Sequence, residues 1–278
     1  MSVYDVITKR LLEELKKGSI PWAKPWRPEY HKPMNWLSER PYQGINFILT
    51  QWNGQYATYK QIREAGGNVK KGAKAIPIVF WKPLEKEDDE TGKKQPKFCL
   101  QYYSVFEVGV DTEGIQRKSV EPMKPIPRQE LLKKYLAEGP KLVHGYTSAS
   151  YEPERDVIRM PEAEKFTSTS HYFKVLFHET IHSTAHTDRL NRPLLNRADD
   201  MKSYAKEELI AEIGSAFLCN LAGIDSEEFL QQNASYLQSW LSVLEEHPKM
   251  ILTASALAQR AVEMIVTTEK QQSLSLAA

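Results

Sequence analysis

The chain has 278 residues, a net charge of +1, 26% charged residues and two cysteines. That length is sufficient for two ordinary domains. The sequence contains no long apolar run and no signal-peptide pattern over residues 1–15, and Cys99 and Cys219 stand in different halves. We therefore expect a cytoplasmic protein with reduced cysteines that does not bind a membrane.

The small net charge averages two unlike halves. Residues 1–128 contain 22 Lys and Arg against 15 Asp and Glu, a net charge of +7, whereas residues 129–278 contain 15 against 21, a net charge of −6. Five of the six tryptophans precede residue 82, and six of the seven histidines follow residue 143. Residues 113–128 are polar and hold three prolines, which is typical of a linker. We predict an α+β protein with two domains, residues 1–112 and 129–278, joined by this linker.

The basic half begins with a predicted amphipathic helix over residues 3–17. Farther along, residues 75–82 and 98–108 are rich in β-branched and aromatic residues, which predicts two strands of a hairpin around a charged loop. The segment between the helix and the hairpin is aromatic and too rich in proline for a helix or a central strand. These features predict a small mixed α+β domain.

Aromatic and basic side chains alternate in this half, as a single-stranded nucleic acid requires. Bases stack on exposed rings, and cationic side chains follow the phosphates without reading the sequence. A Gly-rich turn at residues 66–74 offers lysines and backbone N–H groups to phosphate. The alternative is that the tryptophans fill the core of a small domain. The predicted DNA-binding residues are Trp22, Lys24, Trp26, Arg27, Lys70, Lys71 and Lys74.

The second half contains His178-Glu179-Thr180-Ile181-His182, an HExxH pattern within helical periodicity over residues 168–186. Residues four apart share a face of a helix, so both imidazoles can bind one Zn²⁺, and Glu179 can act on a water at the metal. The alternative is a pair of histidines on a half-buried face, satisfied by water or carboxylates.

A catalytic zinc needs a third protein ligand and an open position. His186 extends the stripe of histidines, but three ligands one turn apart on a straight helix span about 12 Å and cannot reach one ion. The next periodic helix, residues 204–218, carries Glu208 and Glu212 one turn apart. We predict Glu208 as the ligand and Glu212 as the carboxylate that accepts an N–H of a ligand histidine, with His186 in a supporting role. The reverse assignment of the two carboxylates and a solvated acidic face are the alternatives.

These residues predict metal-assisted peptide hydrolysis. Zn²⁺, or Mn²⁺ or another divalent transition metal, would lower the pKa of a water, and Glu179 would take its proton and return it to the leaving amine. Tyr204 and His186 are the candidates for stabilising the oxyanion. Three short strands are expected before the metal helix, at residues 141–145, 148–151 and 157–160. Residues 156–161 would form an edge strand that holds a peptide.

Several motifs resemble ArdC-type antirestriction proteins over nearly the whole chain. The N-terminal half is similar to the N-terminal domain of that family, which is shared with plasmid conjugation primases, at Trp22-x-x-Pro25-Trp26, Pro41-Tyr42-x-Gly44-x-Asn46, Tyr59-x-Gln61 and Gly66-Gly67-x-Val69-x-x-Gly72. The second half resembles the zincin-like metallopeptidase domain of the family at His178-Glu179-x-x-His182, His186, Arg189-Leu190-x-Arg192 and Glu207-Glu208-Leu209-x-Ala211-Glu212.

The resemblance implies that the N-terminal domain binds single-stranded DNA, and it adds Tyr42, Asn46 and Tyr59 to the predicted DNA-binding residues. It also implies protection of incoming plasmid DNA from restriction during conjugation. Three interpretations follow. The chain is a DNA-binding, gluzincin-like peptidase that cuts restriction enzymes or other DNA-bound proteins, a DNA-coating antirestriction protein whose metal domain is dispensable, or a DNA–protein crosslink protease of the SprT kind.

Overall fold

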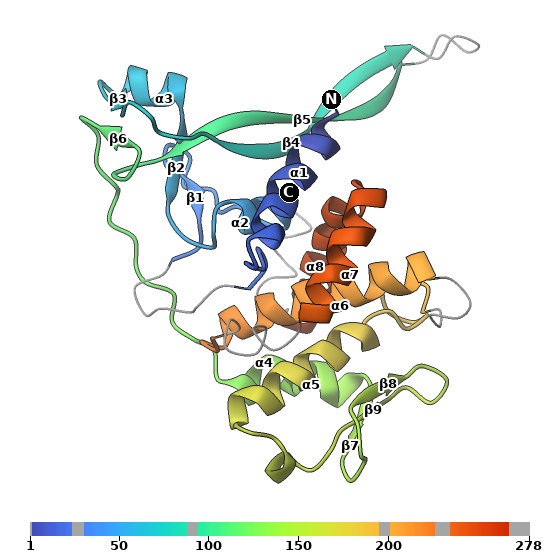
Figure 1. Cartoon of the computed structure of the whole chain (residues 1–278). Coiled ribbons are helices and arrows are strands. Elements are labelled where there is room, and N and C mark those ends of the chain that lie inside the picture. The colour runs from blue at the N-terminus through green and yellow to red at the C-terminus, as the bar shows by residue number, and fades with distance from the viewer. Residues whose placement is uncertain (1, 24–30, 88–93, 195–200, 226–233, 267–278) are drawn as a thin grey trace. The chain divides into compact units, whose positions relative to one another are not determined.

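The computed structural model describes residues 2–23, 31–87, 94–194, 201–225 and 234–266 (Figure 1). Its contacts divide the chain into two compact units, Met1–Leu11 with Tyr30–Pro122, and Leu12–Glu29 with Met123–Ala278. Each unit combines helices with a sheet, which confirms the predicted α+β class and the two-domain organisation. Residues 12–23 belong to the second unit by their contacts, whereas the sequence pattern assigns them to the first domain.

The first unit is built on a four-stranded sheet with the strand order β1-β2-β5-β4, beside a two-stranded sheet of β3 and β6. Its elements are α1 (Val3–Lys16), which continues into the second unit, β1 (Met34–Asn35), α2 (Ile45–Leu49), β2 (Gln55–Thr58), α3 (Tyr59–Glu64), β3 (Asn68–Val69), β4 (Ile76–Glu87), β5 (Lys94–Glu107) and β6 (Thr112–Glu113). The predicted hairpin is therefore present as β4 and β5. Both strands are longer than predicted, because the charged residues assigned to the loop continue the antiparallel pairing as far as Glu87 and Lys94.

The β4–β5 hairpin extends past the rest of its sheet. β2 pairs with β5 only from Val105 to Glu107, whereas β4 pairs with β5 from Ile76 to Glu87. Between Val105 and its tip, the hairpin is therefore a ribbon of two strands only. Figure 1 shows this ribbon extending past β2.

The segment predicted as a linker, residues 113–128, is bound near both of its ends. The side chain of Gln55 donates to the carbonyl of Lys118 at 2.7 Å and accepts from its backbone N–H at 2.9 Å. The backbone N–H of Ile126 donates to the carbonyl of Leu221 at 2.9 Å. These bonds attach the beginning of the segment to the first unit and its end to the second.

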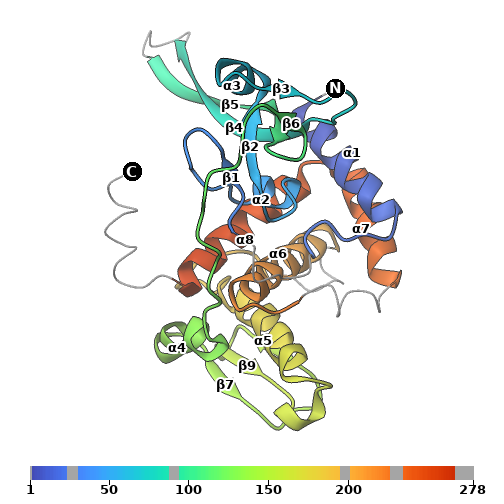
Figure 2. The ribbon, with the colours of Figure 1, turned by 90° about the vertical axis from the view of Figure 1, so that its left-hand side faces the viewer.

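The second unit places a three-stranded sheet against the helix that carries the HExxH motif. Its elements are α4 (Arg128–Glu138), β7 (Lys141–Val143), β8 (Ser150–Glu152), β9 (Val157–Arg159), a 3-10 helix (Ala163–Lys165), α5 (Thr169–Ser183), α6 (Met201–Leu221), α7 (Ala234–Glu246) and α8 (Met250–Val266). α5 packs against the sheet and against α6, and α6 packs against α8 (Figures 1 and 2).

The prediction that residues 156–161 form an edge strand is wrong. The strand order is β7-β9-β8, so β9 lies in the centre and pairs on one side with β7 in parallel and on the other with β8 in antiparallel fashion. Among the described residues, the edges of this sheet belong to β7 and β8. The sequence pattern located the strands but contained no information on their order.

Close packing of α5 and α6 sets the distance between their polar side chains. Ile181 on α5 and Leu209 and Ile213 on α6 are completely buried. A Cβ atom added at Gly214 would lie 2.7 Å from Cδ1 and 2.9 Å from Cγ1 of Ile181, so the absence of a side chain permits this approach. None of the helices in the described part of the chain combines the length and the apolar composition that crossing a bilayer requires.

Candidate metal centre and nucleic-acid surface

Helix α5 carries the HExxH motif and begins where the sequence predicted. The side chain of Ser168 accepts the backbone N–H of His171 at 3.0 Å and caps the first turn. The helix ends at Ser183, three residues before the predicted end. His186 therefore lies beyond the helix, where its Nδ1 accepts the backbone N–H of Asp188 at 3.2 Å. His186 is not part of the cluster described below.

Two arginines that follow α5 bind its last carbonyl groups. Nε of Arg189 donates to the carbonyl of Ser183 at 2.8 Å, and Nη2 of Arg192 donates to the carbonyl of Ile181 at 3.0 Å. Nη1 of Arg192 also donates to Oγ1 of Thr184 at 2.8 Å. Carbonyls at the end of a helix lack partners within the helix, so these bonds stabilise the chain turn that ends α5 before His186.

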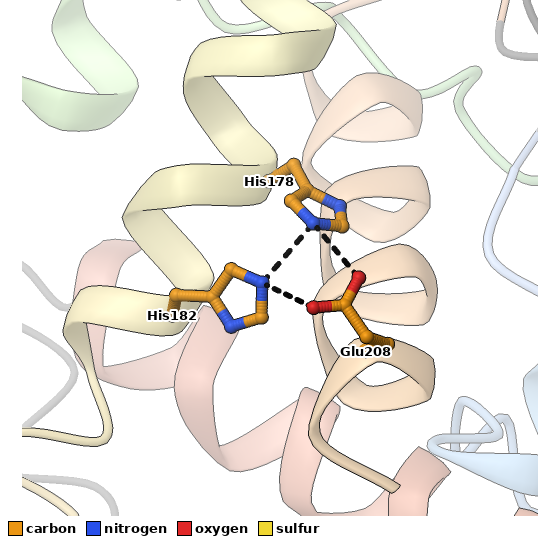
Figure 3. Close-up of side chains that lie close together, drawn as sticks. All are labelled: His178, His182 and Glu208. Carbon is orange, nitrogen blue, oxygen red and sulfur yellow. Dashed lines mark hydrogen bonds and ion pairs between the residues drawn. The ribbon is translucent and has the colours of Figure 1, made fainter. Parts of the chain in front are cut away.

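Three side chains from α5 and α6 converge on one point (Figure 3). Nε2 of His182 lies 3.1 Å from Nε2 of His178, and Glu208 lies with one carboxylate oxygen 3.7 Å from Nε2 of His178 and the other 3.5 Å from Nε2 of His182. Their potential ligand atoms all lie within 4.8 Å of one another. The helical spacing of the motif and the close approach of α6 together account for this arrangement.

The opposite nitrogen of each histidine faces another carboxylate of α6. Nδ1 of His182 donates to Glu207 at 3.3 Å, and Nδ1 of His178 lies 3.7 Å from Glu212. Glu207 is itself bound by Arg192, through Nε at 2.9 Å and Nη2 at 2.7 Å, and both side chains are less than 10% exposed. Glu212 therefore lies beside His178 at a separation longer than a hydrogen bond, so its predicted acceptance of the histidine N–H stays a prediction.

Sequence reasoning missed Glu207 and Arg192. Glu207 belongs to the same motif, but helical spacing singles out Glu208 and Glu212, which lie one turn apart. A buried carboxylate needs a positive partner. Its partner Arg192 is 15 residues away, and Arg197, Lys202 and Lys206 are nearer in sequence, so no local pattern joins the two.

Burial and the neighbouring charges shift the pKa values of the two histidines in opposite directions. Burial, with the charge of His182, lowers the pKa of His178 well below its usual range. Burial alone would also lower the pKa of His182, but the hydrogen bond to Glu207 and the nearby carboxylates raise it. Burial raises the pKa of Glu208, against the charge of His182. For Glu207, the hydrogen bonds from Arg192 and His182 outweigh burial and lower its pKa.

Glu179 lies beside the cluster and is 9% exposed. Burial raises its pKa, the charge of His182 opposes this shift, and the carboxylate accepts the backbone N–H of Tyr151 on β8. Tyr204, predicted as a candidate for the oxyanion, hydrogen-bonds instead to Glu208 one turn along α6. A buried carboxylate with a raised pKa can accept and return a proton near neutral pH, provided that a water lies within reach.

The structure does not support the predicted stacking of bases on Trp22 and Tyr42. Trp22 is 1% exposed, and its ring meets that of Trp240 edge-on at 6.3 Å between centroids in the core of the second unit. Tyr42 is 8% exposed and packs against Tyr56, and burial raises its pKa. Both rings are covered by protein, so neither offers a face to a base. For Trp22, the core alternative considered with the sequence is the better description.

Two of the N-terminal motif residues have structural roles. The side chain of Asn46 donates to the carbonyl of Val79 at 2.8 Å and accepts its N–H at 2.9 Å, which fastens α2 to the edge of β4. Gln61 forms a capping box with Thr58 at the start of α3. The bonds of Asn46 account for its presence without a role in DNA binding.

The remaining predicted DNA-binding residues differ in whether their side chains are exposed and free of bonds to the protein. Tyr59 is 58% exposed, and Lys70, Lys71 and Lys74 are exposed. The ammonium group of Lys70 donates to the carbonyl of Val110 at 2.7 Å, whereas Lys71 and Lys74 face solvent. Three further predicted residues lie outside the described part of the chain: Lys24, Trp26 and Arg27.

Comparison with known families matches both units. The family described as the N-terminal domain of anti-restriction factor ArdC matches residues 1–106, and a family of zincin-like metallopeptidases matches residues 130–257. Two proteins of Escherichia coli named DNA primase TraC are 33% and 32% identical over 97% of this chain. The chain spans only 20% and 27% of the length of those two proteins.

Solved structures match the chain over nearly its full length. The crystal structure of the antirestriction ArdC protein from the R388 plasmid, in its metal-free form, superposes with a TM-score of 0.75 at 31% identity, covering 95% of this chain and 97% of that one. The Mn(II)-bound structure of the same protein gives a TM-score of 0.74 at 30% identity, with the same coverage. The similarity therefore includes a protein that binds a divalent metal.

Proposed function

Because this chain belongs to the ArdC family of antirestriction proteins, we propose that it protects incoming plasmid DNA from restriction in the cytoplasm of a recipient cell. In this proposal the first unit binds single-stranded DNA, and the second unit is a metallopeptidase that cuts restriction enzymes or other proteins on that DNA. The observation that carries the peptidase part is the convergence of His178, His182 and Glu208 within 4.8 Å, with Glu179 beside them.

The three converging side chains fit a divalent transition metal. Two imidazoles and one carboxylate are the ligand set of many catalytic zinc sites, and they leave a position open for water or substrate. The low pKa of His178 keeps its imidazole neutral, as a ligand must be. When bound, the cation supplies Lewis-acid polarisation of a carbonyl and lowers the pKa of a water. We propose Zn²⁺, and the Mn(II)-bound relative supports a divalent ion in general.

In the proposed reaction Glu179 acts as the base, and Glu207 and Arg192 orient the ligand His182. Glu179 takes the proton of the attacking water and returns it to the departing amine, a role that its raised pKa favours. Glu207 accepts the Nδ1–H of His182, so Nε2 is the nitrogen that faces the point shared with His178 and Glu208, and it must give up any proton when a cation binds. Arg192 keeps Glu207 charged and in place, so the orientation of His182 is set before any ion binds.

The DNA-binding part of the proposal depends on the basic first unit. Its support is the match to the ArdC N-terminal domain, the similarity to proteins named DNA primase, and the net charge of +7 over residues 1–128. Tyr59, Lys71 and Lys74 are exposed and can contact bases and phosphates. Binding of this kind follows the backbone and stacks on bases, so we expect little preference for sequence.

The test measures protection in cells together with two properties of the purified chain. A plasmid that carries the gene is transferred by conjugation into recipients with and without a restriction enzyme, and the surviving transconjugants are counted. Glu179→Ala is compared with the wild type and with Glu164→Ala, which removes an exposed carboxylate of the same unit. Metal content and binding of single-stranded DNA are measured for each purified protein.

We expect Glu179→Ala to retain the metal and DNA binding and to lose protection, while Glu164→Ala behaves like the wild type. Full protection by Glu179→Ala would contradict the peptidase role and leave a DNA-coating protein. Failure of the wild type to bind single-stranded DNA would contradict the role of the first unit. Protection against crosslinked adducts but not against restriction would place the chain with crosslink proteases.

A further inference from the structure

The first unit exposes large aromatic side chains on its β4–β5 hairpin that no motif singled out. Trp81 on β4 is 59% exposed, and Tyr102 on β5 is 45% exposed. Aromatic rings of this size are normally buried, because each removes a large apolar area from water. Trp36 and Trp52, the other described tryptophans of this unit, are half-buried and 1% exposed, respectively. The exposure of Trp81 therefore sets it apart.

The strand register places Trp81 and Tyr102 on the same face of the hairpin. Trp81 pairs with Leu100, and Val79 pairs with Tyr102. Side chains alternate between faces along a strand, and directly paired residues share a face. Trp81 and Tyr102 are therefore diagonal neighbours, with their Cβ atoms about 7 Å apart. We call Val79, Trp81, Leu100 and Tyr102 the aromatic face.

The aromatic face is exposed at Trp81 and Tyr102, whereas Val79 is 9% exposed and Leu100 is half-buried. Between Val105 and the tip of the hairpin, β5 pairs only with β4 among the described strands. No third strand is therefore paired with the ribbon beside Trp81 and Tyr102. Phe80 points to the opposite face, where its ring packs against Tyr103 at 5.4 Å between centroids. The two exposed rings of the aromatic face are thus held by a rigid pairing of strands rather than by a loop.

The charge around the aromatic face suits a polyanion. Residues 60–82, which lead into β4 and form its first half, contain six Lys and Arg and a single Glu. Lys71 and Lys74 are exposed shortly before the strand, whereas Lys82 is exposed on the face opposite Trp81, because successive side chains of a strand alternate. Residues 76–82 and 99–106 contain no acidic residue, and the acidic residues of the two strands begin at Glu85 on β4 and at Glu107 on β5. Exposed rings bordered by lysines provide both components that binding of a single strand requires.

We propose that the aromatic face is a base-stacking surface for single-stranded DNA, with Trp81 and Tyr102 each holding one base and Lys71 and Lys74 following the phosphates. The inference rests on the proposed DNA binding of the first unit and moves its site from the Pro-rich tryptophan segment to the hairpin. Stacking accepts any base, since every base has a flat face, so the surface binds without reading the sequence.

The experiment titrates the full chain against a fluorescein-labelled oligothymidylate of about 16 nucleotides and follows fluorescence anisotropy. Trp81→Ala and Tyr102→Ala are the test variants, and Leu37→Ala is the matched control, because Leu37 is 56% exposed in the same unit but outside the aromatic face. Trp81→Phe tests rescue by a smaller ring. Each binding constant is measured at several salt concentrations.

We expect each alanine variant to bind roughly 5- to 100-fold more weakly, with an unchanged slope of log affinity against log salt. Trp81→Phe recovers most of the affinity, and Leu37→Ala matches the wild type. Binding of both alanine variants within about twofold of the wild type would overturn the proposal while leaving DNA binding intact. A wild type without affinity for the oligonucleotide would overturn this proposal together with the DNA-binding function.

Two further results separate other uses of the aromatic face. If it were a contact between copies of the chain, the alanine variants would lose a dimer in sedimentation while their DNA affinity stayed constant, which contradicts the proposal. A change of the salt slope in Trp81→Ala would show that the substitution disturbs phosphate contacts rather than stacking, and would also contradict it. Normal thermal unfolding of the variants excludes misfolding as the cause of weaker binding.

Discussion

The metal centre and the aromatic face place their reactive groups in opposite physical settings. At the metal centre each histidine has a carboxylate behind it, and Glu207 has Arg192 behind it in turn, all largely buried. On the aromatic face, Trp81 and Tyr102 stand on a two-stranded ribbon and are about half exposed. A buried network couples stability to ligand binding, whereas exposed rings contribute to binding alone. Substitutions in the two regions should therefore have different signatures.

The largest effect is expected from Glu207→Ala, because it leaves the guanidinium of Arg192 buried without its partner. We expect the metal-free chain to lose about 3–5 kcal/mol of unfolding free energy. Its affinity for Zn²⁺ should also fall about 10- to 100-fold, since His182 loses the group that orients it. Urea denaturation and competitive metal titration measure the two losses. Glu130→Ala, an exposed carboxylate on α4, is the control, and equal stability of both variants would contradict the coupling.

Trp22→Ala distinguishes a core tryptophan from a DNA-binding one. Its buried ring packs on Trp240, so we expect a loss of about 3–5 kcal/mol in unfolding free energy. Trp81→Ala should leave thermal unfolding nearly unchanged. Under conditions where both variants are folded, Trp81→Ala should lose DNA affinity, whereas Trp22→Ala should keep the affinity of the wild type. Weak DNA binding by a fully folded Trp22→Ala chain would restore the stacking role that the sequence suggested.

Asp156→Asn tests the polar network beside the metal helix through its dependence on pH. Burial alone would raise the pKa of Asp156, but hydrogen bonds from Arg189 and Tyr151 lower it below its usual value. A lowered folded-state pKa contributes stability above the unfolded value of about 3.9, and this contribution is lost as the pH falls through the folded value.

We expect Asp156→Asn to be less stable than the wild type by about 1–3 kcal/mol at neutral pH. The difference should shrink below about pH 4, where the wild-type carboxyl takes up its proton. Urea denaturation at several pH values provides the measurement. A difference that stays constant down to acidic pH would mean that the charge of Asp156 does not stabilise the fold.

The smallest structural effect is expected from Lys71→Gln with Lys74→Gln. Both side chains are exposed, so the thermal midpoint should not move. The slope of log DNA affinity against log salt should decrease by about 0.7 for each phosphate that no longer meets a lysine. The aromatic variants should keep the wild-type slope. If the lysine variants kept it as well, phosphate binding would have to occur elsewhere in the first unit.

Helical periodicity carried most of what the sequence predicted in the second unit. The cap at Ser168, the spacing of His178 and His182, and the stripe that contains Glu208 are local patterns, and local patterns determine which side chains share a face. The order of the strands could not be predicted, because strands of three residues contain too little pattern to indicate their partners. The early end of α5 likewise depends on arginines that return from beyond the helix.

The basic N-terminal half of the sequence shows the limit of composition as a guide to binding. Trp22 and Trp81 are the same residue type in similarly basic surroundings, yet one is 1% exposed and the other 59%. The difference comes from Trp240, more than 200 residues after Trp22 in the chain. Composition therefore predicts DNA binding for this half but does not predict which rings face solvent.

The central claim is that His178, His182 and Glu208 hold one divalent cation, and anomalous X-ray scattering from crystals soaked in Zn²⁺ tests it most directly. We predict a single strong peak within bonding distance, about 2.0–2.2 Å, of Nε2 of both histidines and of a carboxylate oxygen of Glu208. Glu207 and Glu212 should remain on the far nitrogens. A peak bound by Glu212 or His186 in place of Glu208, or no peak at this point, would contradict the claim.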